Sequence, residues 1–211
     1  MLKLHPATFI KYKFFNSLFT GLSIGMLFTI YEPIQPTTFS IGGIILALGM
    51  LLIAKFYDKL LNINSFFIIS LIVEITMLIT VVTLVLLGYS IISALLIYIG
   101  YQLTFIFGGY LVRAETLVAS DKNLLAKIDM SKQVGYLVGL GLSLLFYKIL
   151  EQQYDINESK NQITILHYFL ILLQLVIIIQ LVRSFRKWIT VTTIFSLHYH
   201  YQKYRIRLYL Y

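Results

Sequence analysis

The sequence contains no cysteine, which excludes disulfide bonds, thiolate nucleophiles and cysteine-ligated metal sites. Charged side chains are also scarce, at 12% of the chain, whereas soluble domains carry about 25%. Catalytic patterns are missing too: there is no Gly-rich phosphate loop before an expected helix, no His-Glu-x-x-His motif, and no serine with histidine and carboxylate partners at a suitable spacing. We therefore expect no enzymatic activity, no cofactor and no metal.

Hydrophobic residues are correspondingly abundant. Hydrophobic residues make up 59% of the chain, and the mean hydropathy is +0.84. A membrane-spanning helix needs about 20 mostly apolar residues. Because lipid offers the backbone no hydrogen-bond partners, each such run must form a helix. The sequence predicts an all-α polytopic membrane protein, in which residues 1–187 form one bundle with spans at 14–31, 37–54, 65–87, 91–112, 133–150 and 163–182.

The positive charges predict an orientation. Of the seventeen lysines and arginines, fifteen fall at the two ends of the chain or in the second and fourth connections, and only Lys148 and Lys160 fall on the other side. Cytoplasmic loops retain lysine and arginine, so both termini are predicted to be cytoplasmic, in an integral protein of a bacterial cytoplasmic membrane. Topology and attraction to anionic headgroups account for the net charge of +8, and no nucleic-acid partner is inferred.

Two segments depart from the hydrophobic pattern. The window "VRAETLVASDKNLLAKIDMSK", residues 112–132, holds seven of the twenty-six charged residues, and we expect it to be the longest cytoplasmic connection. Residues 188–211 mix aromatic and cationic side chains, which favour the headgroup region, so this tail is predicted to lie on the inner membrane surface. A partner-binding segment and a reading-frame artefact are the alternatives for the tail.

Small residues recur at four-residue spacing on two spans. Ser17, Gly21 and Gly25 form such a stripe on the first span, and Gly135, Gly139 and Ser143 form one on the fifth. Small residues on one face let helix backbones approach closely in membranes. These stripes predict tight helix contacts and say nothing about a substrate.

Two stretches resemble a known family. The second connection reads "AKFYDKLLN", in which Asp58 and Lys59 match the central Asp-Arg pair of the major facilitator superfamily signature, although Ala54, Leu61 and Asn62 replace two glycines and an arginine. The stretch "LLAKIDMSKQVGYLVGLGLSLL" is similar to the start of that family's fifth helix. Over residues 10–182 the chain resembles the N-terminal six-helix half of such a transporter. The family has two such halves, so this one would either work as a homo-oligomer or be a copy that does not transport.

The resemblance implies a transport path. In the family, helices one and four line a central cavity, which makes Asn16, Tyr98 and Gln102 path candidates. Tyr98 and Gln102 lie four residues apart and therefore share a helix face. Ordinary hydrogen bonding between helices explains the same residues equally well.

Glu74 is the acidic residue at mid-depth in the third span. An ionisable group at that depth is costly and marks a functional candidate, for example a proton carrier. The alternative is a protonated carboxyl that bonds to a neighbouring helix. The resemblance argues against a central role for Glu74, because third helices are peripheral in the family.

Four charged residues are candidates for a cytoplasmic gate: Asp58, Lys59, Arg113 and Glu115. We hypothesise an ion pair between Arg113 and Asp58, since bonds of this kind close the inner gate in the resembled family. The alternative is that Arg113 extends to the headgroups as a topology signal.

Two functions remain open at this point. One is a half-size transporter of a small, unidentified solute that works as a homodimer in the bilayer. The other is a membrane scaffold or accessory subunit that binds a partner membrane protein.

Overall fold

The structure, a computed structural model, describes residues 2–119 and 121–187, so the tail predicted at 188–211 lies outside the described residues. Within these described residues, eight helices and two short strands follow one another. They are β1 (Leu2–Leu4), α1 (Pro6–Tyr31), α2 (Pro36–Lys55), α3 (Tyr57–Leu60), α4 (Ile63–Leu87), α5 (Ile91–Ile106), α6 (Gly108–Ala119), α7 (Lys122–Tyr154), α8 (Ser159–Ser184) and β2 (Phe185–Lys187).

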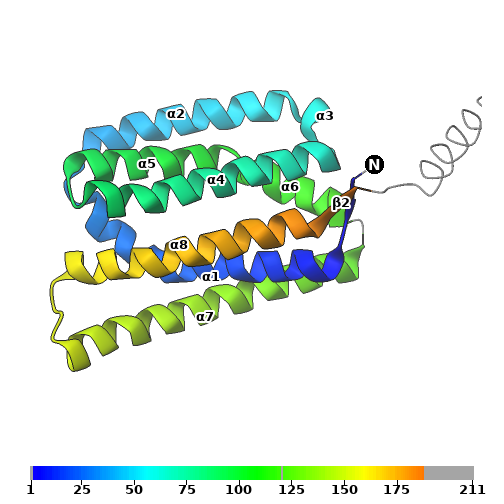
Figure 1. Cartoon of the computed structure of the whole chain (residues 1–211). Helices are drawn as coiled ribbons and strands as arrows, with labels where there is room; N and C mark the ends of the chain where they lie inside the picture. Colours follow the sequence, from blue (N-terminus) through cyan, green and yellow to red (C-terminus); the bar gives the residue numbers. More distant parts are fainter. Residues whose placement is uncertain (1, 120, 188–211) are drawn as a thin grey trace, which may run out of the picture.

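Six helical segments within the described residues are long and apolar enough to cross a membrane, which confirms the predicted number of spans. The fourth span consists of α5 and α6, which meet at Phe107 in front of the pair Gly108 and Gly109. Figure 1 shows the long helices side by side with nearly parallel axes, so the bundle is one helix long.

The charged window at 112–132 differs from its prediction. It is helical almost throughout, because α6 continues to Ala119 and α7 already begins at Lys122, after Asp121 caps it by accepting from the Asn123 amide at 3.1 Å. The first span likewise begins at Pro6 rather than at residue 14, with His5 as its cap. Hydropathy reports the apolar part of a helix, and both helices continue beyond that part into charged turns that pair inside the bundle.

The small-residue stripes pack α1 against α7, as predicted. A methyl group added to Gly21 would lie 2.9 Å from the Gly139 Cα, and one added to Gly135 would meet the backbone of Phe14. Only hydrogen at these positions permits such an approach. Gly25 takes no part, since an added methyl group there would meet no other atom within 4 Å.

The main helix contacts form a regular pattern. The first span, α1, packs on the fifth and sixth, α7 and α8. The fourth, α5, packs on the second and third, α2 and α4, and the third packs on the sixth. If span one is exchanged with span four, two with five and three with six, the same set of contacts results. Because three crossings separate the exchanged spans, the two triplets run in opposite directions through the bundle.

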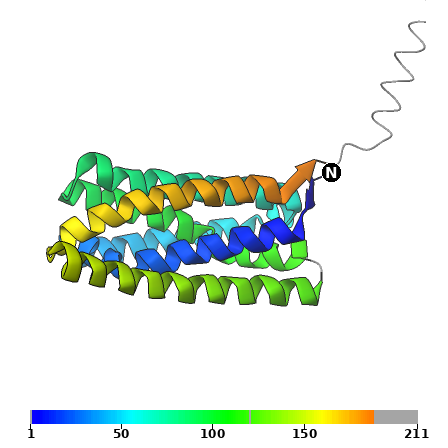
Figure 2. The same cartoon turned by 60° about the horizontal axis from the view of Figure 1, so that its bottom comes forward.

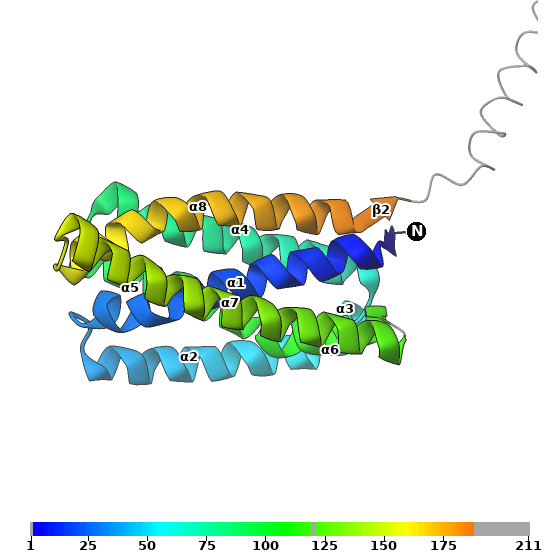
Figure 3. The same cartoon turned by 90° about the horizontal axis from the view of Figure 1, so that it is seen from below.

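The two ends of the described chain meet at one end of the bundle. Strand β1 pairs antiparallel with β2, with Leu2 opposite Lys187, and the His5 amide donates to the Ser184 carbonyl oxygen at 2.8 Å. Figures 2 and 3 show both strands beside the turn between α6 and α7, whereas the turns that join α1 to α2 and α7 to α8 lie at the opposite end.

Candidate functional site

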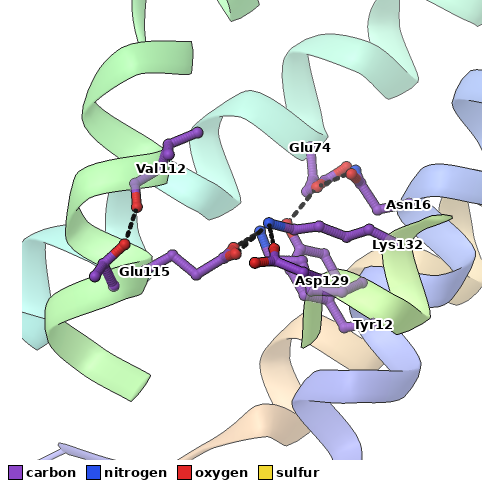
Figure 4. A network of polar contacts seen from close by, with 9 residues as sticks. Tyr12, Asn16, Glu74, Val112, Glu115, Asp129 and Lys132 are labelled. Atoms are coloured by element: carbon purple, nitrogen blue, oxygen red, sulfur yellow. Dashed lines mark hydrogen bonds and ion pairs between the residues drawn. The ribbon is translucent and has the colours of Figure 1, made fainter. Parts of the chain in front are cut away.

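Glu74 lies near the middle of α4 and is 2% exposed. Its Oε1 accepts hydrogen bonds from the Tyr12 hydroxyl at 2.6 Å and from Asn16 Nδ2 at 2.9 Å, and its Oε2 accepts from Gln174 Nε2 at 2.7 Å. Helices α1 and α8 thus hold a carboxylate that α4 supplies. Figure 4 shows Tyr12 and Asn16 converging on it.

All three partners donate, and this fits an ionised carboxylate, which only accepts. Gln174 Nε2 also donates to the backbone carbonyl oxygen of Glu74 at 2.9 Å. A flipped amide would bring two oxygens together there, so the backbone fixes which end of the amide faces the carboxylate. Among the ion pairs of the described residues, none includes Glu74. The three side chains that donate to Glu74 are therefore all neutral groups.

A cavity of about 290 Å³ adjoins Glu74. Helices α1, α4, α5 and α8 enclose it, and its walls combine polar and apolar side chains. The polar lining is Asn16, Thr20, Ser23, Glu74, Tyr101, Thr104 and Gln174, and the apolar lining is Phe19, Ile24, Leu27, Val73, Met77 and Phe105.

This cavity contains an unsatisfied group. The Tyr101 hydroxyl is buried and lies close to Ser23, but it makes no hydrogen bond of ordinary geometry with any described residue. A buried polar atom without a partner is costly. The cavity therefore offers a hydroxyl that a bound molecule could satisfy.

The rim of the cavity opens between α1 and α5, which make few contacts with each other. Thr20 and Ile24 on α1 and Phe105 on α5 line the cavity and are exposed. Glu74 therefore lies behind an opening on the side of the bundle rather than at one of its ends.

A second buried carboxylate, Glu115 on α6, has cationic partners. It forms ion pairs with Lys13 of α1 and Lys132 of α7, and Lys132 also pairs with Asp129 at 3.2 Å. Glu115 is 3% exposed. We call these four residues the charge cluster. It joins three helices, and Figure 4 shows it next to the Glu74 site.

One turn of α1 connects the two acids. Tyr12 donates to Glu74, and the following residue, Lys13, pairs with Glu115 while its ammonium lies 5.3 Å from the centre of the Tyr12 ring. A rotation or tilt of α1 would change both contacts together.

The structure separates the predicted path residues. Asn16 and Glu74 share the site described above. Tyr98 and Gln102 do share a face, but they line another cavity, of about 270 Å³, between α2 and α5. Tyr98 donates to the Phe39 carbonyl oxygen at 3.4 Å, and Gln102 Oε1 is buried without a partner among the described residues.

The predicted gate residues also separate. Asp58 and Lys59 lie on the short helix α3, and the Arg113 guanidinium lies over the Tyr57 ring, 5.7 Å from its centre. Within the described residues, no ion pair joins Arg113 and Asp58. The aromatic face of Tyr57 supplies the contact that the hypothesis assigned to Asp58. Glu115 alone of the four joins an ion-paired cluster.

Sequence reasoning missed Tyr12, Lys13, Lys132 and Gln174. Tyr12 and Lys13 precede residue 14, where the first span was predicted to begin, so Tyr12 was passed over and Lys13 was read as a topology signal. A comparison of depth would have helped, since Asn16, Glu74 and Gln174 all lie near the middle of their helices.

Comparison of the chain with protein-family models, with curated proteins and with solved structures finds no match. The described residues form a nearly all-helical bundle in which six helical segments are long and apolar enough to span a membrane. The resemblance to the major facilitator superfamily stays a prediction that rests on the quoted motifs.

Proposed function

We propose that the protein is a membrane transporter of a small solute, and that a parallel homodimer forms the solute path. The observation that carries this proposal is the cavity beside Glu74. A buried carboxylate at mid-depth that adjoins a polar cavity fits a solute site, because ionisable groups inside membranes are expensive and concentrate on substrate or ion paths. The cavity volume of about 290 Å³ is at the small end of the range for ligand pockets, which supports a small solute.

The contact pattern of the spans supports the same function. Many transporters are built from two triplets of helices with opposite directions, and their sites lie near the membrane midplane. The described spans pair in a way that matches such triplets. In a transporter of this plan both termini would be cytoplasmic and the inner gate would lie near the charge cluster.

The side of the bundle on which the cavity opens supports a homodimer. Thr20 and Ile24 would face lipid in a monomer, although the cavity behind them contains a carboxylate, hydroxyls and amides. A second copy, related by an axis along the membrane normal, would supply the missing wall. Ile24 and Phe28 are exposed on α1 and suit cross-linking between two copies, whereas the neighbouring Ser23 is only 3% exposed.

The absence of cysteine makes a direct test simple, since single-cysteine variants need no altered background. Cysteine at Thr20 or Thr104 should react with a membrane-impermeant thiol reagent from either side of oriented vesicles, because the path would open alternately to each side. Cysteine at Ile68, an exposed position on α4 away from the cavity, is the matched control and should stay unreactive.

A second arm measures assembly. Cysteine at Ile24 or Phe28 should give disulfide-linked dimers in native membranes, and the mass in nanodiscs should be that of two chains. Protected positions 20 and 104 together with a monomer mass would contradict the transporter. A different membrane protein bound in fixed ratio would favour the accessory-subunit function instead. The almost unburied helix α2 would then be the natural contact surface.

A further inference from the structure

Of the buried titratable groups in the described spans, Glu74 is the acid whose charge has no cationic partner. The charge cluster carries its own lysines, and His167 bonds to the Ile163 carbonyl oxygen within its helix at 2.8 Å. The cavity between α2 and α5 is mostly apolar, and no charged side chain of the described residues lines it. Among these buried groups and cavities, Glu74 and its cavity are therefore best suited to bind a charged ligand.

The carboxylate has acceptor capacity left. An ionised carboxylate offers about four acceptor positions, and Tyr12, Asn16 and Gln174 use three of them. A ligand with one positively charged N–H would complete the set and neutralise the charge. Charge-assisted bonds of this kind are about twice as strong as neutral ones.

The other residues that line the cavity indicate the chemistry of the rest of the ligand. Phe19, Tyr101 and Phe105 place aromatic rings along it, and Leu27 and Met77 add aliphatic surface. No lysine, arginine or histidine among the described residues lines it, so these residues offer an anionic ligand no counter-charge. Aromatic faces attract cations and also bury apolar groups.

Three hydroxyl groups also line the cavity, those of Ser23 on α1 and of Tyr101 and Thr104 on α5, and the Tyr101 hydroxyl has no hydrogen-bond partner among the described residues. A bare metal ion fits poorly, because the described residues contain no group of three or more acidic or histidine side chains that could hold one. The volume also exceeds what a single ion needs.

From this geometry we propose that the cavity binds a small protonated amine with an apolar body, whose ammonium group donates to the Glu74 carboxylate. The inference rests on the proposed transport function for its biological meaning, but binding itself does not require transport. It names the solute class as monovalent organic cations.

The test measures binding of n-alkylamines, from butylamine to octylamine, and of 2-phenylethylamine to the purified protein in nanodiscs by titration calorimetry. The matched neutral probe is 2-phenylethanol, and the matched anion is 3-phenylpropionate. The amines should bind saturably and the anion should not. The alcohol should bind about ten- to a hundredfold more weakly, because it forms no charge-assisted bond.

Three variants locate the site. Glu74→Gln should weaken amine binding by about ten- to a hundredfold and leave the alcohol unchanged. Thr104→Leu, which fills the cavity without touching Glu74, should weaken both. Glu151→Gln, an exposed acid near the end of α7, is the matched control and should bind like the parent protein. If Glu74→Gln does not fold, Thr104→Leu still decides whether the cavity is the site.

Equal binding of the amine and the alcohol would overturn the proposal, since the cavity would then recognise only apolar bulk. Unchanged amine binding in Glu74→Gln and Thr104→Leu, or no binding by any amine of the series, would also overturn it. Uptake into proteoliposomes separates the two proposals. An amine that binds but is not transported would support the amine site and contradict the transport function. Thiol labelling from both sides of the membrane without amine binding would support transport and contradict the amine site.

Discussion

Glu74 and Glu115 are both carboxylates buried to within a few per cent, yet their surroundings differ. Glu115 pairs with the ammonium groups of Lys13 and Lys132, so its charge is neutralised within the protein. Glu74 accepts hydrogen bonds from a phenol and two amides, and none of the ion pairs among the described residues includes it. The difference separates a charge that joins helices from a charge that is available to a ligand.

The position of each acid in the bundle explains the difference. Glu115 lies where α1, α6 and α7 meet, and each neighbouring helix contributes a cation or a second acid. Glu74 lies at mid-depth, where α1, α4, α5 and α8 enclose a cavity. Removing one partner from a buried ion pair is strongly destabilising, whereas a charge held by neutral donors depends on several weaker bonds. Mutations should therefore separate the two sites by their effects on stability.

The largest expected effect follows the removal of Glu115. Glu115→Gln leaves the buried Lys13 and the partly exposed Lys132 without their shared carboxylate, which should cost about 3–5 kcal/mol in free energy of unfolding. Unfolding in mixed micelles, followed by circular dichroism, measures the change. The double variant Glu115→Gln with Lys13→Met should recover part of the loss because it removes one unpaired charge. A loss as small as that of the exposed control Glu151→Gln would show that the charge cluster does not join the helices.

A smaller effect is expected at Tyr12. Tyr12→Phe removes one charge-assisted hydrogen bond from Glu74 and should cost about 1.5–3 kcal/mol. Tyr168→Phe on the exposed face of α8 is the matched control and should leave the free energy of unfolding unchanged. In a Glu74→Gln background the cost of Tyr12→Phe should fall by about half, because the acceptor is then neutral. Equal costs in both backgrounds would contradict an ionised Glu74.

Glu74→Gln itself should change the free energy of unfolding by less than about 1 kcal/mol, since loss of the charged bonds is offset by the removal of a buried uncompensated charge. The same unfolding experiment measures it. The difference between the effects of Glu74→Gln and Glu115→Gln on the free energy of unfolding is the most direct test of the contrast between the two acids. A loss of several kcal/mol at Glu74 would make both carboxylates structural.

The sequence predicted the number and approximate position of the spans, because apolar runs long enough to cross a bilayer have few other uses. It also predicted tight helix contacts at the two small-residue stripes, since small residues at four-residue spacing share a face, but only the structure shows that Gly21 and Gly139 face each other. It missed where α1 and α7 begin, because their first turns are charged and hydropathy does not distinguish a charged helix turn from a loop.

The Glu74 site was half visible in the sequence. Glu74 stood out as an acidic residue at mid-depth and Asn16 as a path candidate from the family resemblance, but nothing in one sequence shows that α1 and α8 both face α4 at that depth. Tyr12 and Gln174 reach Glu74 across 62 and 100 residues of chain. Contacts at such separations depend on the packing of the bundle, and local spacing does not encode them. The expected ion pair between Arg113 and Asp58 is another case. The Arg113 guanidinium instead lies over the ring of Tyr57, the residue next to Asp58.

The smallest expected effect concerns that absent pair. In a double-mutant cycle of Asp58→Asn and Arg113→Gln, the free energies of unfolding should add to within about 0.5 kcal/mol, because the side chains form no ion pair. The cycle of Lys13→Met and Glu115→Gln, measured in the same way, is the positive control and should show a coupling several times larger. A cycle of Arg113→Gln and Tyr57→Leu should give about 0.5–1 kcal/mol, as expected for a cation over an aromatic ring at an exposed site. Coupling between Arg113 and Asp58 as large as that in the charge cluster would mean that the two residues meet in another conformation of the bundle, and the gate hypothesis from the sequence would regain its basis.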